Sequence, residues 1–184
     1  MSAIDKPSSI LTYMQDSPTT EDSPRLTKIK PWVVATDGSA DHIAGLAAHA
    51  WWAKDGSHYS NCVTGDTSVM AEWAAIEAAL GAAPLGRPVK IYSDYRYAVK
   101  LISKALASNA KSSTTILNGN LPAFIKDSIS RIEKLADGRD VTISWVRAHT
   151  GDRGSLPHLN KMADHLARRT LRKRRYFESD HYVI

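Results

Sequence analysis

The sequence predicts one α/β domain built on a five-stranded mixed sheet, with three antiparallel strands, then two parallel strands, and helices on both faces. Three runs rich in β-branched and aromatic residues follow one another within residues 32–64. Two later runs of this kind alternate with helical patterns, as parallel strands joined by crossovers do. A length of 184 residues with 43% hydrophobic residues suits a single globular domain.

The three leading strands are predicted to form an antiparallel meander, because the hairpin signal Asp55-Gly56 separates the second from the third. We expect them at Trp32–Thr36, Ile43–Ala53 and His58–Thr64. In this prediction Asp37 closes the first strand. Gly38 then lets the backbone turn sharply and lets a ligand approach closely.

The remaining elements alternate between helix and strand. A helix should begin at Thr67-Ser68, which offer an N-cap, and end near Leu80, before Gly81. Beyond it we expect strands at Val89–Ser93 and Val141–Val146, helices at Tyr95–Ala107, Leu121–Ala136 and Leu159 to about Arg175, and loops at Ser108–Asn120 and His149–His158. The strand at Val89–Ser93 is expected to run parallel to the first strand.

The composition of the chain also predicts the boundaries of the domain and its cellular compartment. Residues 1–28 are polar and lack periodicity, so we expect a disordered leader, a folded domain at 29–176 and a tail at 177–184. We find neither a secretory signal nor an apolar run long enough to span a bilayer, and expect no membrane partner. The single cysteine, Cys62, rules out an internal disulfide framework and fits a reducing compartment, so we expect a cytoplasmic protein, and a monomer.

The positive charge is concentrated near the end of the domain. The chain has a net charge of +5, and six of the eight residues from 168 to 175 are Arg or Lys. Cations also suit the C-terminal end of a helix, but this number exceeds what the helix dipole requires. We therefore interpret the run, and within it Arg172, Lys173, Arg174 and Arg175, as a nucleic-acid contact.

Two aspartates follow strands that should be parallel neighbours. Asp37 follows the first strand and Asp94 follows Val89–Ser93, so both carboxylates should emerge at one edge of the sheet, where ligands bind in such folds. Either residue could instead be the N-cap of the next element. Two of them at matching ends of adjacent strands favour a site.

Five further residues have an ambiguous role when each is considered alone. Glu72 and Glu77 flank the apolar stripe of their helix symmetrically, so periodicity does not choose between them. Asn160 and Asp164 share a face in the first turns of the last helix, but acidic residues favour helix N-termini without any catalytic role. His149, in a loop after the last strand, could act as a proton shuttle beside a carboxylate cluster.

Taken in order, these motifs resemble type 1 ribonuclease H. They are Thr36-Asp37-Gly38-Ser39, a glutamate in the first helix, Ser93-Asp94 after a strand, Trp145-Val146-Arg147-Ala148-His149, and Asn160 with Asp164. The resemblance covers residues 31 to about 170, including the order of elements. It implies a ribonuclease H-like fold and an endonuclease that cuts the RNA strand of RNA/DNA hybrids with two Mg²⁺ ions, for which Mn²⁺ can substitute.

The resemblance also implies roles for individual residues. It selects Glu72 over Glu77 and makes Asp37, Glu72, Asp94 and Asp164 the metal-binding carboxylates. Four carboxylates brought together need a counter-charge, and Mg²⁺ takes hard oxygen ligands. His149 would assist proton transfer or product departure, and Asn160 would support the metal site or contact substrate. The expected products carry 5′-phosphate and 3′-hydroxyl ends.

The expected substrate contacts differ from the family's pattern. Backbone groups near Gly38 and Ser39 would sense the 2′-OH that distinguishes RNA from DNA. Ser68 stands where asparagine often precedes the helix glutamate, and Arg96 stands where glutamine is common. The stretch Ser108–Asn120 lacks the family's basic, Trp-containing protrusion, so we expect the arginine-rich last helix to replace it in part.

Two other functions compete with this interpretation. The chain could be a hybrid-binding module that kept the fold and lost catalysis, which the presence of all four carboxylates argues against. It could also be another nuclease on the same architecture, such as a proofreading exonuclease, a junction resolvase or an integrase. Such exonucleases usually show Asp-x-Glu in the first strand, where this chain has Ser39.

Overall fold

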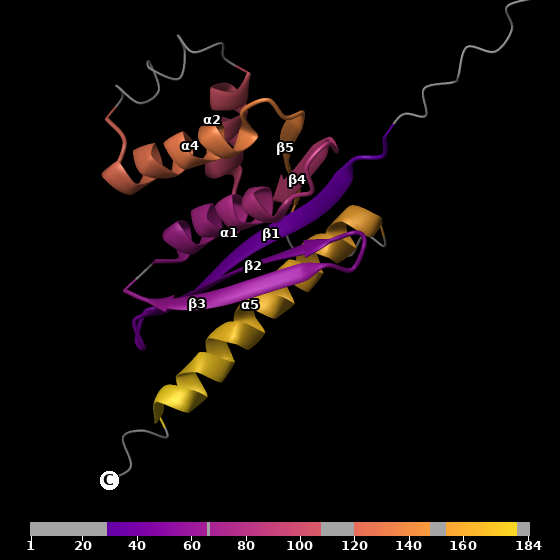
Figure 1. Cartoon of the computed structure of the whole chain (residues 1–184). Coiled ribbons are helices and arrows are strands. Elements are labelled where there is room, and N and C mark those ends of the chain that lie inside the picture. Colours follow the sequence, from indigo (N-terminus) through magenta and orange to yellow (C-terminus); the bar gives the residue numbers. More distant parts are fainter. Residues whose placement is uncertain (1–28, 66, 108–119, 148–153, 180–184) are drawn as a thin grey trace, which may run out of the picture.

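The computed structural model describes residues 29–65, 67–107, 120–147 and 154–179. Five strands form one sheet in the order β3-β2-β1-β4-β5, as Figure 1 shows. The strands are β1 (Trp32–Asp41), β2 (Leu46–Ala53), β3 (His58–Thr64), β4 (Val89–Ser93) and β5 (Val141–Trp145). The pairs β1–β2 and β2–β3 are antiparallel, and β1–β4 and β4–β5 are parallel. The predicted sheet is confirmed.

Helices lie on both faces of the sheet (Figure 1). They are α1 (Ser68–Ala82), α2 (Arg96–Leu106), α4 (Ala123–Ala136) and α5 (Ser155–Ser179). On one face α1 packs on β1, β2 and β4, with α2 and α4 beside it; on the other face α5 crosses β1, β2 and β3. The chain thus folds into three layers, with the sheet in the middle.

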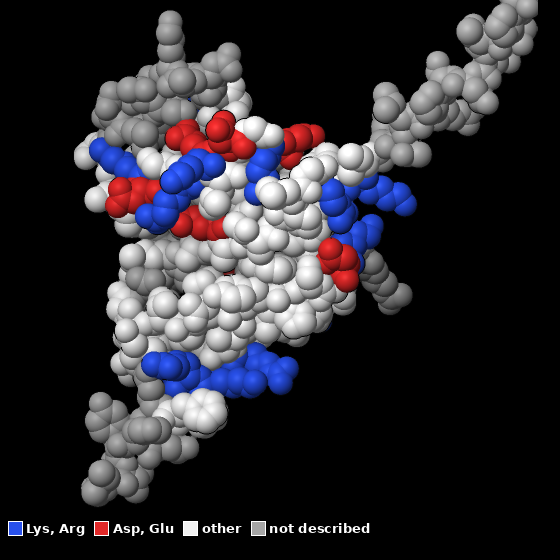
Figure 2. All heavy atoms as spheres, in the orientation of Figure 1, with Lys and Arg blue, Asp and Glu red and all other residues white. Residues whose placement is uncertain are grey.

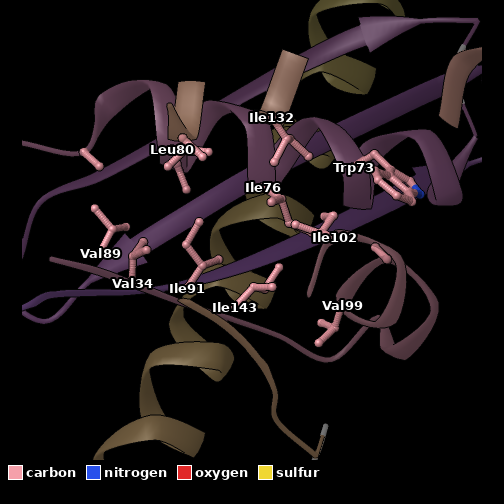
Figure 3. Packing of buried hydrophobic residues seen from close by; sticks show 14 of the residues in the cluster. Val34, Trp73, Ile76, Leu80, Val89, Ile91, Val99, Ile102, Ile132 and Ile143 are labelled. Carbon is pink, nitrogen blue, oxygen red and sulfur yellow. The ribbon is translucent and has the colours of Figure 1, made fainter. Parts of the chain in front are cut away.

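The main hydrophobic core fills the space beneath α1, α2 and α4 (Figure 3). Trp73, Ile76 and Leu80 form the predicted apolar face of α1, and all three are buried. They meet Val34 and Ile91 from the sheet, since side chains at alternate positions of a strand point to the same face. A smaller cluster beneath α5 contains Leu46, Ala48 and Leu171, with Cys62 packed against it.

The first strand is longer than predicted. β1 continues through Gly38 to Asp41, and its last residues pair with the start of β2. Asp41 closes the hairpin, because its Oδ1 accepts hydrogen bonds from the backbone N–H groups of Ile43 and Ala44, both at 3.1 Å. The prediction that Asp37 ends the strand was therefore wrong. The predicted start of the second strand at Ile43 was also wrong, since Ile43 lies in the turn and is 96% exposed.

The glycine at position 38 is explained by helix packing, not by a turn. A Cβ atom there would lie 2.5 Å from the backbone N of Glu72 and 2.7 Å from the backbone C of Ala71. Only a residue without a side chain lets α1 cross β1 this closely. The predicted sharp turn at Gly38 is therefore absent, and the position sets the distance between β1 and the first turns of α1.

The last helix begins earlier and ends later than expected. α5 runs from Ser155 to Ser179, where the sequence predicted a loop to His158 and a helix from Leu159 to about Arg175. The first turn includes Pro157, a residue tolerated there because its missing N–H would have no helical partner. The predicted leader at 1–28 and most of the predicted loop at 108–120 lie outside the described residues, as does His149.

Candidate active site

The site is built at the edge of the sheet where β1 and β4 stop pairing. The last pair in their parallel register is Thr36 with Ser93, so Asp37 and Asp94 are the next residues on the two neighbouring strands. Asp37 is buried, with 6% of its surface exposed. The predicted convergence of these two aspartates at one edge agrees with the register.

Glu72 reaches this edge from α1. The close packing of Gly38 against the backbone of Ala71 and Glu72 holds the start of α1 against β1. Thr67 caps the helix, since its Oγ1 accepts a hydrogen bond from the N–H of Met70 at 3.2 Å. Within the described part of the chain, Oε2 of Glu72 is buried and has no hydrogen-bond partner. A buried carboxylate oxygen in this state is suited to a cation or a proton.

The second glutamate of α1 lies elsewhere. Glu77 accepts two hydrogen bonds from the guanidinium of Arg131 on α4, at 2.7 and 3.1 Å. This bidentate pair links α1 to α4. The two glutamates that periodicity could not separate therefore have different neighbours, and only Glu72 interacts with Asp37 and Asp94.

α5 brings Asn160 and Asp164 to the same edge from the other face of the sheet. Asn160 is buried, and its Nδ2 donates a hydrogen bond of 3.1 Å to Oδ2 of Asp94. Its Oδ1 is buried and has no partner among the described residues. Asp164 forms an ion pair of 2.6 Å with Arg168, one helical turn further on. The Asn160 bond thus ties α5 to the sheet edge, whereas the ion pair of Asp164 lies within α5 itself.

The carboxylates interact strongly with one another. Burial, followed by the negative charges of Asp94 and Asp164, raises the pKa of Asp37 from its ordinary value of 3.8 to about 8. Burial, followed by the charge of Asp37, raises the pKa of Glu72 well above its ordinary value. The charge of Arg168 acts on Asp37 in the opposite direction. Ionising these buried carboxylates together is therefore unfavourable, and the charge of Arg168 offsets this only in part.

This donor set fits a divalent metal in its chemistry. Mg²⁺ binds carboxylate oxygens, and its charge would offset the repulsion that raises these pKa values. Within the described residues, no three acidic, histidine or cysteine side chains are already arranged as ligands of one ion. Asp94 is held by Asn160 and Asp164 by Arg168, so a metal would compete with Arg168 for the Asp164 carboxylate.

The residues predicted to contact substrate lie in three different elements, β1, α1 and α2. Ser39 lies in β1 two residues past Asp37, and Ser68 is the first residue of α1. The Arg96 guanidinium lies 4.2 Å from the centre of the Trp145 ring. The backbone N–H of Gly38 lowers the pKa of both Asp37 and Glu72, so it interacts with the carboxylates themselves.

The basic residues of α5 lie beyond the carboxylates along the helix. Arg172, Lys173 and Arg174 are exposed, and Figure 2 shows Lys and Arg side chains gathered over the C-terminal part of α5. Arg175 donates a hydrogen bond of 3.0 Å to Oδ2 of Asp41, at the end of β1. The basic run is therefore anchored at the end of β1, four residues beyond Asp37 in the same strand.

Two residues near the carboxylates were not expected at this site in the sequence analysis. Arg168 pairs with Asp164, and the i, i+4 spacing of opposite charges on a helix was a usable signal for it. Trp145 is 40% exposed and its Nε1–H donates a hydrogen bond of 3.0 Å to the backbone carbonyl of Asp94. No local pattern identifies that contact, because the two residues are 51 positions apart.

Comparison with known proteins gives a consistent result. A family model described as RNase H matches residues 30–172, a range that contains all five strands. The chain is 31% identical over 137 residues to the ribonuclease H of Tropheryma whipplei (strain Twist), covering 74% of this chain and 81% of that protein. It is 31% identical over 144 residues to the ribonuclease HI of Streptomyces coelicolor, covering 73% and 59%. It is 30% identical over 121 residues to the ribonuclease H of Anaeromyxobacter sp. (strain K), covering 66% and 60%.

Proposed function

Because this chain belongs to the ribonuclease H family and is thus a nuclease, we propose that it hydrolyses the RNA strand of RNA/DNA hybrids with two divalent metal ions. The products would carry 5′-phosphate and 3′-hydroxyl ends. The observation that supports this most directly is that burial, followed by the charges of neighbouring carboxylates, raises the pKa values of both Asp37 and Glu72. Such a cluster lowers stability unless a cation balances it.

The proposed metal ligands are Asp37, Glu72, Asp94 and Asp164. Bound Mg²⁺, or Mn²⁺ in its place, would supply the positive charge that activates an attacking water and stabilises the leaving 3′ oxygen. Asn160 positions the Asp94 carboxylate by its hydrogen bond. Arg168 holds Asp164 and partly offsets the negative charge until the metal arrives.

We assign the transfer of the proton and the binding of the substrate to residues other than the four carboxylates. His149 accepts or delivers the proton at the scissile phosphate. Ser39, two residues past Asp37 in β1, Ser68, the first residue of α1, and backbone groups near Gly38 would contact the RNA strand, whose 2′-OH distinguishes it from DNA. Within the part of the chain described here, no helix is both long and apolar enough to cross a membrane. We propose that the enzyme works as a monomer in the cytoplasm, for which the single cysteine is the sequence support.

The test is cleavage of an end-labelled RNA/DNA hybrid in Mg²⁺, in parallel with duplex RNA, duplex DNA and single-stranded DNA. We expect cleavage of the hybrid alone, and none with Asp94→Asn, whose thermal unfolding is measured to show that it folds. Failure of the wild-type protein to cut the hybrid in either Mg²⁺ or Mn²⁺ would instead favour a hybrid-binding module. Efficient cutting of either form of DNA would indicate another nuclease of this architecture.

A further inference from the structure

An exposed cation and an exposed aromatic ring lie together directly beside Asp94. The guanidinium carbon of Arg96, at the start of α2, lies 4.2 Å from the centre of the Trp145 indole, at the end of β5. The Trp145 side chain is 40% exposed, and Arg96 is exposed as well. A guanidinium at this distance over an indole face is a cation–π contact.

The same pair is tied to Asp94 by two hydrogen bonds. The backbone carbonyl of Asp94 accepts from Nε1 of Trp145 at 3.0 Å and from the backbone N–H of Arg96 at 3.0 Å. The ring, the guanidinium and the carboxylate are therefore held by one peptide unit. Motion of Trp145 relative to the sheet edge is restricted by this bond and by its place at the end of β5.

A cation beside Asp94 suits a polyanionic substrate. The edge carries acidic side chains from three elements, Asp37, Glu72 and Asp94 among them, and none of these would attract a phosphate by itself. Of the two nearby arginines, Arg168 is occupied by Asp164. The Arg96 guanidinium forms no ion pair among the described residues, and stacking on a ring leaves its N–H groups pointing outward in the plane of the guanidinium.

We propose that Arg96, held on the face of Trp145, binds a backbone phosphate of the hybrid next to the one that is cut. Trp145 is the positioning residue of this clamp, since it holds the guanidinium in one place and so reduces the side-chain entropy lost when the phosphate binds. The clamp rests on the proposed function for the identity of its ligand. It adds a defined phosphate contact on the Asp94 side of the carboxylates, away from the basic end of α5.

The experiment measures the affinity for a short labelled RNA/DNA hybrid against salt concentration, in Ca²⁺ in place of Mg²⁺ so that binding is read apart from cleavage. Arg96→Gln should weaken binding about three- to tenfold and lower the slope of log affinity against log salt by about one, the value for a single phosphate that is no longer neutralised. Lys90→Gln is the matched control, because Lys90 is an exposed cation near the other end of β4. It should leave the slope unchanged.

Two variants of the ring separate a positioning role from a merely structural one. Trp145→Leu should weaken binding nearly as much as Arg96→Gln, whereas Trp145→Phe, which keeps an aromatic face, should restore most of the affinity. The double variant Arg96→Gln/Trp145→Leu should bind no more weakly than Arg96→Gln, because the ring acts through the arginine. In Mg²⁺ both Arg96→Gln and Trp145→Leu should raise KM and leave kcat within about twofold, as loss of uniform binding does.

Several outcomes would overturn the clamp. They are a salt slope for Arg96→Gln equal to that of Lys90→Gln, additive effects in the double variant, or a loss of kcat without a change in KM. Since Arg96 is exposed, its variant remains informative even if Trp145→Leu unfolds. Wild-type protein that binds the hybrid but cuts it in neither Mg²⁺ nor Mn²⁺ would contradict the proposed activity, and the binding series would still decide on the clamp.

Discussion

Gly38 is the residue at which the fold and the site depend on a single missing side chain. Replacement of Gly38 by Ala would place a Cβ 2.5 Å from the backbone N of Glu72. Because that neighbour is backbone and cannot rotate away, we expect α1 to shift and the free energy of unfolding to fall by about 3 kcal/mol, at the upper end of the cost of overpacking. Chemical denaturation measures the loss, and cleavage of a hybrid should fall with it as Glu72 moves.

The control for this substitution lies on the same helix. Gly81 is a residue of α1, and a methyl group added there would meet no heavy atom of the described residues within 4 Å outside its own stretch of helix. Gly81→Ala should raise the free energy of unfolding by about 0.5–1 kcal/mol, since alanine favours helix more than glycine does. A Gly38→Ala protein as stable as the wild type would show that α1 does not need this close approach to β1.

Asp37 should make the metal-free protein less stable as the pH rises. Its pKa is about 8 in the folded protein, mainly through burial, against an ordinary value of 3.8, so the folded state binds more protons than the unfolded chain between these values. The free energy of unfolding should therefore fall by about 1.4 kcal/mol per pH unit for this one proton. Glu72, whose pKa is also raised, acts in the same direction.

Thermal unfolding in EDTA between pH 5 and 9 measures this dependence, with the decline expected up to about pH 8, the pKa of Asp37 in the folded protein. Asp37→Asn should flatten the decline. Asp55→Asn should not, because the hydrogen bond from Ser57 lowers the pKa of Asp55 and its titration lies below the window. Stability of the metal-free wild type that stayed constant or rose with pH would contradict the charge repulsion inferred at the sheet edge.

The helix α1 carries two glutamates with different partners. Glu72 faces the carboxylates of the candidate site, and Glu77 pairs with Arg131 on α4. Glu72→Gln should reduce cleavage at least about 100-fold, as expected for loss of a metal ligand, without lowering stability, because it removes a buried negative charge. Glu77→Gln should leave cleavage within about twofold and lower the free energy of unfolding by only about 0.5–1 kcal/mol, since its partner Arg131 is 57% exposed. Cleavage assays and chemical denaturation of both variants test this. A large loss of cleavage in Glu77→Gln, with little loss in Glu72→Gln, would contradict the assignment.

The comparison of these two glutamates shows what local pattern could and could not predict. Periodicity placed the buried face of α1 correctly, because burial of Trp73, Ile76 and Leu80 depends on spacing alone. It could not separate Glu72 from Glu77, because the difference lies in partners far along the chain. Arg131, which binds Glu77, is 54 residues away. Resemblance to a family supplied that choice, which stays a prediction; in the folded chain Glu72 interacts with Asp37 and Asp94.

The predicted end of β1 was wrong for the same reason, because contacts far along the chain decide the structure at Gly38. A glycine after an aspartate is an ordinary turn signal, so the strand was predicted to end there. In the fold, the backbone at Gly38 stays in the sheet opposite His49, and the missing side chain makes room for α1. The meeting of Asp37 and Asp94 at one edge was predictable, because it follows from the parallel pairing of two strands.

At the scale of the whole molecule, charge is divided between an acidic edge and a basic helix end. Asp164 and Arg175 are both on α5, about 16 Å apart along its axis at 1.5 Å per residue. Arg175 contacts Asp41, at the end of the strand that carries Asp37. One turn of a duplex spans roughly 34 Å, so a hybrid placed at the carboxylates could also reach the exposed cations near the end of α5.

Neutralising these cations should therefore weaken binding without changing the chemistry. In Arg172→Gln/Lys173→Gln/Arg174→Gln we expect a higher KM, an unchanged kcat and a salt slope lower by roughly one to three, about one for each phosphate that the helix no longer neutralises. Arg175 is kept, because its bond to Asp41 holds the helix end near β1. The control neutralises three exposed lysines outside α5, Lys54, Lys90 and Lys134, and so has the same change in net charge. An equal loss of slope in the two triple variants would mean that only net charge matters, and an unchanged slope in the α5 variant would exclude this helix from the hybrid contact.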